Sequence, residues 1–252
     1  MKKFFILLSV ACALFCLVSC SEFKSNGIVH IVSVGAGNGT SIAEACIFDA
    51  EEIAGRFDEI YKKKNISTSV NLLTDTNISR ETLLNALSNI DASSEDLIIF
   101  YYSGHGGNCQ LATGNDSKDA KQHTPMTSVT DILASKECKC VAIIDACEIG
   151  AQYENGTPGA GFESLFKEIK ISNVSVIASS SKSQYSQGTD KSTSHSLYTR
   201  CILDALASVS ASDKLTTKQL YDNSLKFNTT LLEYFNQDPE INFNEIDIVI
   251  IP

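Results

Sequence analysis

The chain has 252 residues, which is enough for one or two domains with a sizeable core. Apolar residues make up 43% and charged residues 20%, so the composition is globular and excludes collagen-like and disordered classes. Acidic residues outnumber basic ones by 30 to 20, which gives a formal net charge of −10. Such a surface repels phosphate backbones, and we therefore expect no nucleic-acid partner.

Residues 1–19 have the three regions of a secretory signal peptide. Two lysines precede an apolar run from Phe4 to Val18, which at about fifteen residues is shorter than the roughly twenty of a spanning helix. The leader ends in the letters LVSC, which resemble a bacterial lipobox, where the cysteine is acylated and becomes the mature N-terminus. We expect a lipoprotein that is held at a membrane of the bacterial cell envelope by acyl chains on Cys20, with residues 20–27 as a tether. An uncleaved anchor and an ordinary signal peptide are the alternatives.

Strand-like apolar runs alternate with helical spacing along the rest of the chain. The expected strands cover residues 28–34, 68–73, 97–102, 140–144, 174–178 and 246–251. The expected helices cover 41–60, a segment capped by Asn77 or Ser79 that ends at Ile90, 127–135, 162–169, 196–207 and 217–235. This alternation predicts an α/β fold with a mostly parallel sheet covered on both faces, and one domain over residues 28–252.

The cysteines outside the leader fall into two groups. Cys138 and Cys140 lie two apart at the start of a strand, so their side chains point to the same side and do not readily bond to each other. The chain has no paired CxxC motifs, so the sequence does not indicate a structural zinc site. Cys147 is distinct, because it directly follows a buried strand. The others are expected to be small buried hydrophobic residues, namely Cys46, Cys109, Cys138, Cys140 and Cys201.

Two apolar strands end in residues that carry chemistry. LIIFYY continues into Ser-Gly-His105-Gly106-Gly, and VAIID continues into Ala-Cys147-Glu. Reactive groups in open α/β sheets gather beyond the carboxyl ends of strands, and neighbouring strands lie about 4.8 Å apart. His105 beside Cys147 can generate the thiolate that attacks in acyl transfer. The backbone N–H groups of Gly106 and Cys147 are suited to an oxyanion hole.

The pair of motifs YYSGHGG and IIDACEIG resembles the caspase-like cysteine peptidases, and is most similar to bacterial metacaspase-like members. The caspase signature is QAC[RQG]G with its histidine upstream, and here Asp145 stands in place of the glutamine. The resemblance implies a caspase-hemoglobinase fold, a three-layer sandwich with a six-stranded sheet between helices. It also implies a cysteine endopeptidase with Cys147 as nucleophile and His105 as general base and acid. Weaker similarity follows in family order at residues 49–50, 70–75, 178–181, 195–199 and 237–241.

The resemblance also bears on the bond that is cut. Caspases bind a substrate aspartate through arginines, but residues 35–41 and 178–187 contain none. Metacaspases have an aspartate two residues before the nucleophile in the first specificity pocket, and Asp145 matches that position. A buried carboxylate needs a cationic partner, so we expect cleavage after Lys or Arg. Alternatively, Asp145 only hydrogen-bonds loop amides. By resemblance, Ser179 and Ser180 lie on the strand that pairs with the substrate backbone.

Glu148 is a departure from the family pattern. Metacaspases commonly have His-Ser-Gly after the cysteine, where this chain has Glu-Ile-Gly. A carboxylate that points inward would raise the pKa of the thiol and weaken thiolate formation. A catalytically inactive caspase-like scaffold that binds peptides or protein partners is therefore the alternative function. A non-peptidase thiol hydrolase or transferase is a third candidate.

Other features carry less functional information. No cofactor is expected; Asp116 and Asp119 lie in a plausible calcium loop, but EF-hand spacing is absent, so calcium dependence stays open. The loop GAGNG resembles a dinucleotide-binding turn, but Thr40 occupies the third Gly/Ala position. Self-cleavage is expected after Lys182 or Lys191 in a polar stretch. Histidines expected to be packed or solvated rather than catalytic are His30, His123 and His195.

Overall fold

The computed structural model of the protein describes residues 27–74, 78–114, 119, 121–149, 153–154, 157–158, 173–180, 184–189, 191, 193–210, 212–242 and 247–252. The predicted signal peptide, the predicted lipidation site Cys20 and the helix predicted at 162–169 lie outside these residues. Within the described ranges, no helix is long and apolar enough to cross a membrane.

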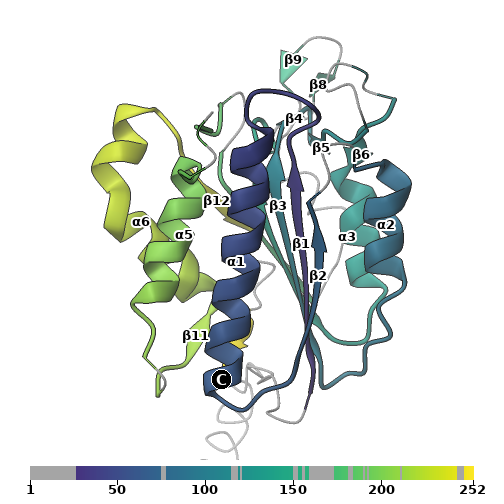
Figure 1. Ribbon diagram of the computed structural model, residues 1–252, viewed down its shortest axis with the longest axis vertical. Coiled ribbons are helices and arrows are strands. Elements are labelled where there is room, and N and C mark those ends of the chain that lie inside the picture. Colours follow the sequence, from purple (N-terminus) through teal and green to yellow (C-terminus); the bar gives the residue numbers. More distant parts are fainter. Residues whose placement is uncertain are drawn as a thin grey trace, which may run out of the picture.

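A six-stranded sheet forms the centre of the protein, in the order β12-β10-β7-β3-β1-β2 (Figure 1). Its parallel strands are β1 (Val29–Ala36), β2 (Thr68–Leu73), β3 (Leu97–Gly104), β7 (Lys139–Asp145) and β10 (Val174–Ala178), and β12 (Glu240–Asn242) runs antiparallel at one edge. The predicted α/β class and the mostly parallel sheet are confirmed.

Helices cover both faces of this sheet (Figure 1). On one face lie α1 (Ala43–Lys63), α5 (Leu197–Ala207) and α6 (Thr217–Tyr234); on the other lie α2 (Arg80–Ser88) and α3 (Met126–Ala134). The arrangement is therefore a three-layer sandwich.

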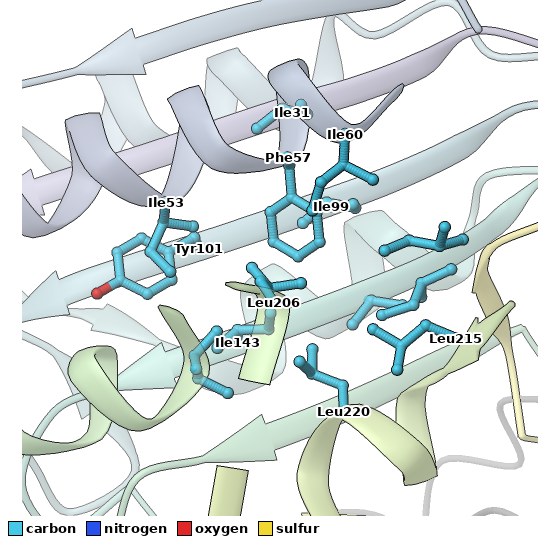
Figure 2. Packing of buried hydrophobic residues seen from close by; sticks show 14 of the residues in the cluster. Ile31, Ile53, Phe57, Ile60, Ile99, Tyr101, Ile143, Leu206, Leu215 and Leu220 are labelled. Atoms are coloured by element: carbon cyan, nitrogen blue, oxygen red, sulfur yellow. The ribbon is translucent and has the colours of Figure 1, made fainter. Parts of the chain in front are cut away.

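The core of each face follows from the alternation of side chains along a strand. Ile99 and Tyr101 of β3 face α1, where Phe57 packs among them (Figure 2), whereas Phe100 and Tyr102 belong to the cluster beneath α2 and α3. Because both faces are covered, β3 is apolar at almost every position, which explains the unbroken run LIIFYY.

The last predicted strand, at residues 246–251, is present as β13 (Val249–Ile251) but lies outside the main sheet. It pairs with β11 (Leu215–Thr216) in a separate two-stranded sheet. The edge position belongs to β12, whose three residues are too few to show a hydrophobic period.

Short strands beyond the main sheet were not predicted. After β3 the chain forms a small antiparallel sheet of β4 (Gly106–Gly107), β5 (Gln110–Leu111) and β6 (Thr124–Pro125). A second small pair is β8 (Tyr153–Glu154) with β9 (Thr157–Pro158). Two-residue strands carry no periodic signal, so a sequence pattern does not detect them.

The predicted cap of α2 and the predicted state of the cysteines agree with the structure. Of the two predicted caps for α2, Ser79 is correct, since its hydroxyl accepts a hydrogen bond from the Thr82 amide at 3.0 Å. The Sγ atoms of Cys138 and Cys140 lie 3.9 Å apart and are not bonded. The cysteines predicted as buried hydrophobic residues are all buried and free, namely Cys46, Cys109, Cys138, Cys140 and Cys201.

Candidate active site

The two predicted strand ends lie next to each other. β3 and β7 are neighbours with Ser103 opposite Asp145, and His105 and Cys147 each follow two residues later. A Cβ atom added to Gly106 would lie only 2.9 Å from the carbonyl oxygen of Cys147, so the two loops touch. The residues predicted for the oxyanion hole, Gly106 and Cys147, are thus in contact, and glycine is required at 106 for this approach.

His105 and Cys147 line one cavity of about 430 Å³ at the carboxyl ends of the strands. Asp145 lines it as predicted, and so do Asp49 and Ser103, which sequence reasoning did not select as site residues. Among the described residues that line it, none is Lys or Arg. The cavity therefore combines an imidazole, two carboxylates and two thiols, of which Cys46 belongs to α1 and Cys147 follows β7.

The tautomer of His105 follows from its contact with Thr40. The Thr40 hydroxyl donates its single proton to the Gly37 carbonyl oxygen at 2.6 Å, and it lies 3.0 Å from His105 Nε2. It must therefore accept from Nε2–H, which leaves Nδ1 without a proton. Burial lowers the pKa of His105, so the neutral imidazole is favoured and Nδ1 can act as a base.

The thiol of Cys147 is also held in its neutral form. Burial raises its pKa, a backbone hydrogen bond from Ser186 lowers it, and the charges of Asp145 and Glu148 raise it further. The neutral thiol also donates to the Ser186 carbonyl oxygen at 3.7 Å, a bond that a thiolate cannot make. The expected effect of Glu148 is confirmed in direction, although burial is the larger cause. A neutral thiol beside a neutral imidazole requires proton transfer during the reaction.

The backbone of Glu148 stabilises the turn after β7, in addition to the effect of its charged side chain. Its φ is +51°, a left-handed conformation that is uncommon outside glycine. Its amide donates to the Gln184 carbonyl oxygen at 3.0 Å, and its carbonyl oxygen accepts from the Cys109 amide at 3.2 Å. These bonds fix the turn that presents Cys147.

Asp145 is a buried carboxylate that caps α5. Its Oδ2 accepts hydrogen bonds from the Ser196 hydroxyl, the Thr199 amide at 3.0 Å and the Thr199 hydroxyl at 2.7 Å. Its Oδ1 accepts from the Ser186 hydroxyl at 2.5 Å. These partners are three hydroxyl groups and the amide of Thr199 in the first turn of α5, so they are not the loop amides of the alternative prediction. Oδ1 keeps an acceptor site, and Asp145 lines the cavity.

Asp49 is the second carboxylate of the cavity. Its Oδ2 accepts from the Ser103 hydroxyl at 2.8 Å, and its Oδ1 lies 2.9 Å from His195 Nδ1 and 3.3 Å from the Ser196 amide. Burial raises its pKa, and the hydrogen bond to His195 opposes that shift. The sequence could have identified Asp49 because it lies on the apolar face of a helix. A buried charge without a partner destabilises the fold, so an aspartate at such a position indicates a polar partner.

Ser179 and Ser180 support the cysteine loop. Both are fully buried immediately after β10. The Ser179 hydroxyl accepts from the Ala146 amide at 3.1 Å, and the Ser180 hydroxyl donates to the Ala146 carbonyl oxygen at 3.0 Å. The Ser179 carbonyl oxygen accepts from Gln237 Nε2. The predicted contact with a substrate backbone stays a prediction.

Other predicted positions lie away from this cavity or outside the described residues. Asp116 and Lys182 are outside them, Asp119 bonds to Gln122, and Lys191 is exposed. Among the described residues, no group of three or more His, Cys, Asp or Glu side chains is placed to hold a metal ion. The arginines lie on helices, as the sequence indicated: Arg56, Arg80 and Arg200.

Comparison with known proteins agrees with this architecture. The sequence model of the family described as "Caspase domain" matches residues 26–244. The chain is similar in structure to protein GSU0716 from Geobacter sulfurreducens, with a TM-score of 0.56 and 14% sequence identity, over 86% of this chain and 92% of that chain. No curated protein matches. Because the family match spans most of the chain, including both motif-bearing strand ends, this protein belongs to the caspase domain family.

Proposed function

We infer that the protein is a cysteine endopeptidase that acts through a thioester on Cys147 and prefers Lys or Arg before the cleaved bond. The observation that carries this function is the single cavity that contains Cys147, His105 and the carboxylates of Asp49 and Asp145. Caspase domain membership supports a cysteine peptidase.

The reaction begins with a proton transfer. His105 Nδ1 takes the proton of the Cys147 thiol as the sulfur attacks the peptide carbonyl carbon. The imidazolium gives that proton to the leaving amine as the C–N bond breaks, and a thioester remains. Water then loses a proton to His105 and attacks the thioester, which releases the acid and restores the thiol. Backbone N–H groups at Gly106 and Cys147 stabilise the oxyanion in both halves.

The substrate preference rests on the charge of the cavity. Two buried carboxylates favour a cationic side chain, and the described residues that line the same cavity include no Lys or Arg. A substrate Lys or Arg reaches the acceptor site that remains on Asp145 Oδ1. No arginine in the part of the chain that the structure describes lines this cavity to receive an acidic side chain, because Arg56 and Arg200 line a different groove and Arg80 begins α2.

A peptide chloromethyl ketone ending in arginine tests this function. It should alkylate Cys147 in the wild type and fail to alkylate the His105→Ala variant, as intact-mass spectrometry and peptide mapping measure. An inactive scaffold would bind the peptide without labelling. A non-peptidase thiol hydrolase or transferase would be labelled but would cleave no member of a peptide-substrate library.

Thr40 is expected to hold the imidazole in its active tautomer. Thr40→Val keeps the shape and removes the hydroxyl, so kcat should fall about tenfold or more while KM changes little. Thr40→Ser should restore most of the rate. Thr130→Val is the matched control, since that buried hydroxyl bonds only within α3. Equal kcat values for Thr40→Val and the wild type would contradict the role of Thr40.

The lipid anchor is a separate proposal about location. Metabolic labelling with an alkyne fatty acid in a bacterial host should tag the wild type, and Cys20→Ser should abolish the tag. Cys16→Ser removes a leader cysteine outside the lipobox and should keep the tag. An unlabelled, freely secreted product would exclude lipidation at Cys20.

A further inference from the structure

His195 separates the substrate cavity from a second cavity. It precedes α5, and its ring stacks on Phe48 of α1, with ring centroids 4.5 Å apart and planes 7° from parallel. Its Nδ1 lies 2.9 Å from Asp49 Oδ1. The His195 side chain is 20% exposed, whereas that of Asp49 is only 1% exposed. The pair therefore has one member in contact with solvent and one buried at the substrate cavity.

The second cavity is a groove of about 750 Å³ between α1 and α5, which lie side by side (Figure 1). Arg56 pairs with Glu59 and Arg200 with Asp204, so the basic side chains of this groove have acidic neighbours of their own. The charged groups that line this groove together with His195 are Glu51, Glu52, Arg56 and Glu59 from α1 and Arg200 and Asp204 from α5, and Asp49 contacts His195 directly.

The hydrogen bond to Asp49 fixes where His195 exchanges a proton. A carboxylate only accepts, so Nδ1 carries a hydrogen whether the ring is neutral or charged. A proton is therefore gained or lost at Nε2, and His195 lines the groove. The charge of Asp49 is uncompensated when His195 is neutral and is cancelled when His195 is protonated.

We propose that His195 is a positioning residue that sets the net charge of the substrate cavity, and thereby the affinity for a basic substrate side chain, according to pH. The inference rests on the proposed function and adds its regulation. With neutral His195 the cavity presents two carboxylate charges, from Asp49 and Asp145; with protonated His195 it presents one. A fall in pH that protonates His195 therefore lowers the affinity of the cavity for Lys or Arg.

A proton on Asp49 itself has the same effect on the cavity. Burial raises the pKa of this carboxyl, and its partners Ser103, Ser196 and His195 oppose the shift. A proton taken up by either member of the pair removes one negative charge. The expected direction is therefore the same for both sites of protonation, and a substitution at His195 separates them.

The test compares two peptide amides that differ only in having Arg or norleucine before the cleaved bond. For the wild type, KM of the Arg peptide should rise at least about threefold from pH 8 to pH 6, since an opposite charge in contact shifts a titration by a unit or more. KM of the norleucine peptide should stay constant. In His195→Asn, an amide N–H replaces Nδ1–H without titrating, so KM of the Arg peptide should be nearly constant from pH 8 to pH 6.

The matched control is His30→Asn, which alters another histidine beside a carboxylate, Asp96, near the amino ends of the strands. It should keep the wild-type pH dependence. A wild-type dependence that persists in His195→Asn would overturn the inference and leave the peptidase function intact. Hydrolysis of neither peptide by the wild type would remove the proposed function, and the inference with it.

A second measurement needs no substitution at residue 195. Calorimetry of a peptide ending in arginine, bound to Cys147→Ala protein in two buffers of different ionisation enthalpy, reports protons released on binding. Release at pH 6 and none at pH 8 is expected, because the bound cation favours neutral His195. Absence of release at pH 6 would contradict the inference even if His195→Asn does not fold.

Discussion

Cys147→Ala and His105→Ala should each abolish peptidase activity and leave the fold unchanged. The two side chains exchange one proton, so removing either one disables the same step. The double variant should be no worse than the single variants, because nucleophile and base act as one unit. Initial rates with the Arg peptide measure the losses, and circular dichroism with thermal unfolding measures the fold.

The matched control is Cys201→Ala, which removes another thiol that is fully buried far along the chain in α5. It should keep activity and lose some stability through the cavity it creates. Full activity in Cys147→Ala or in His105→Ala would exclude the proposed mechanism. Activity that survives only in His105→Ala would point to a different base.

Replacement of Asp145 should change both specificity and stability. In Asp145→Asn, either the new NH2 group faces the Ser196 and Thr199 donors, or the amide oxygen faces them and these donors lose their charged acceptor. The free energy of unfolding should fall by about 2 to 4 kcal/mol. The kcat/KM for the Arg peptide should fall more than about a hundredfold, because a desolvated charge pair contributes several kcal/mol.

Two comparisons separate these effects. Asp96→Asn also weakens a buried carboxylate, one that accepts from the Ile28 and Ser93 amides away from the cavity, so it should lower stability without changing the ratio of Arg to norleucine cleavage. An equal loss for both peptides in Asp145→Asn would assign Asp145 a structural role only. Cleavage mainly after Asp in the wild type would overturn the pocket assignment and spare the catalytic pair.

Local patterns were sufficient to predict most of the fold. A strand buried on both faces is an uninterrupted apolar run, and β10, which is buried along its whole length, has the predicted bounds. The same logic placed His105 and Cys147 at neighbouring strand ends, since parallel strands end at one edge of the sheet. The edge strand β12 was missed because three residues have no measurable period.

The polar contacts of the site required the tertiary structure. Thr40 and His105 are 65 residues apart, and Asp49 and His195 are 146 apart. Neither pair has a spacing that a sequence pattern detects, and Thr40 was considered only as a poor match to a dinucleotide-binding turn. The hydrogen bonds exist because α1 and the loop before it pack against β3 and α5 in one register.

The sequence by itself determined the α/β alternation, the buried cysteines and the strand ends that carry His105 and Cys147, because each of these depends on hydrophobic period or on position at a strand end. The tertiary structure decided which hydroxyl fixes the tautomer of His105, which second carboxylate lines the cavity and which histidine contacts it. These are contacts between side chains from distant segments. They depend on the positions of the helices relative to the sheet to within about an ångström, because a hydrogen bond tolerates no larger change in the donor–acceptor distance.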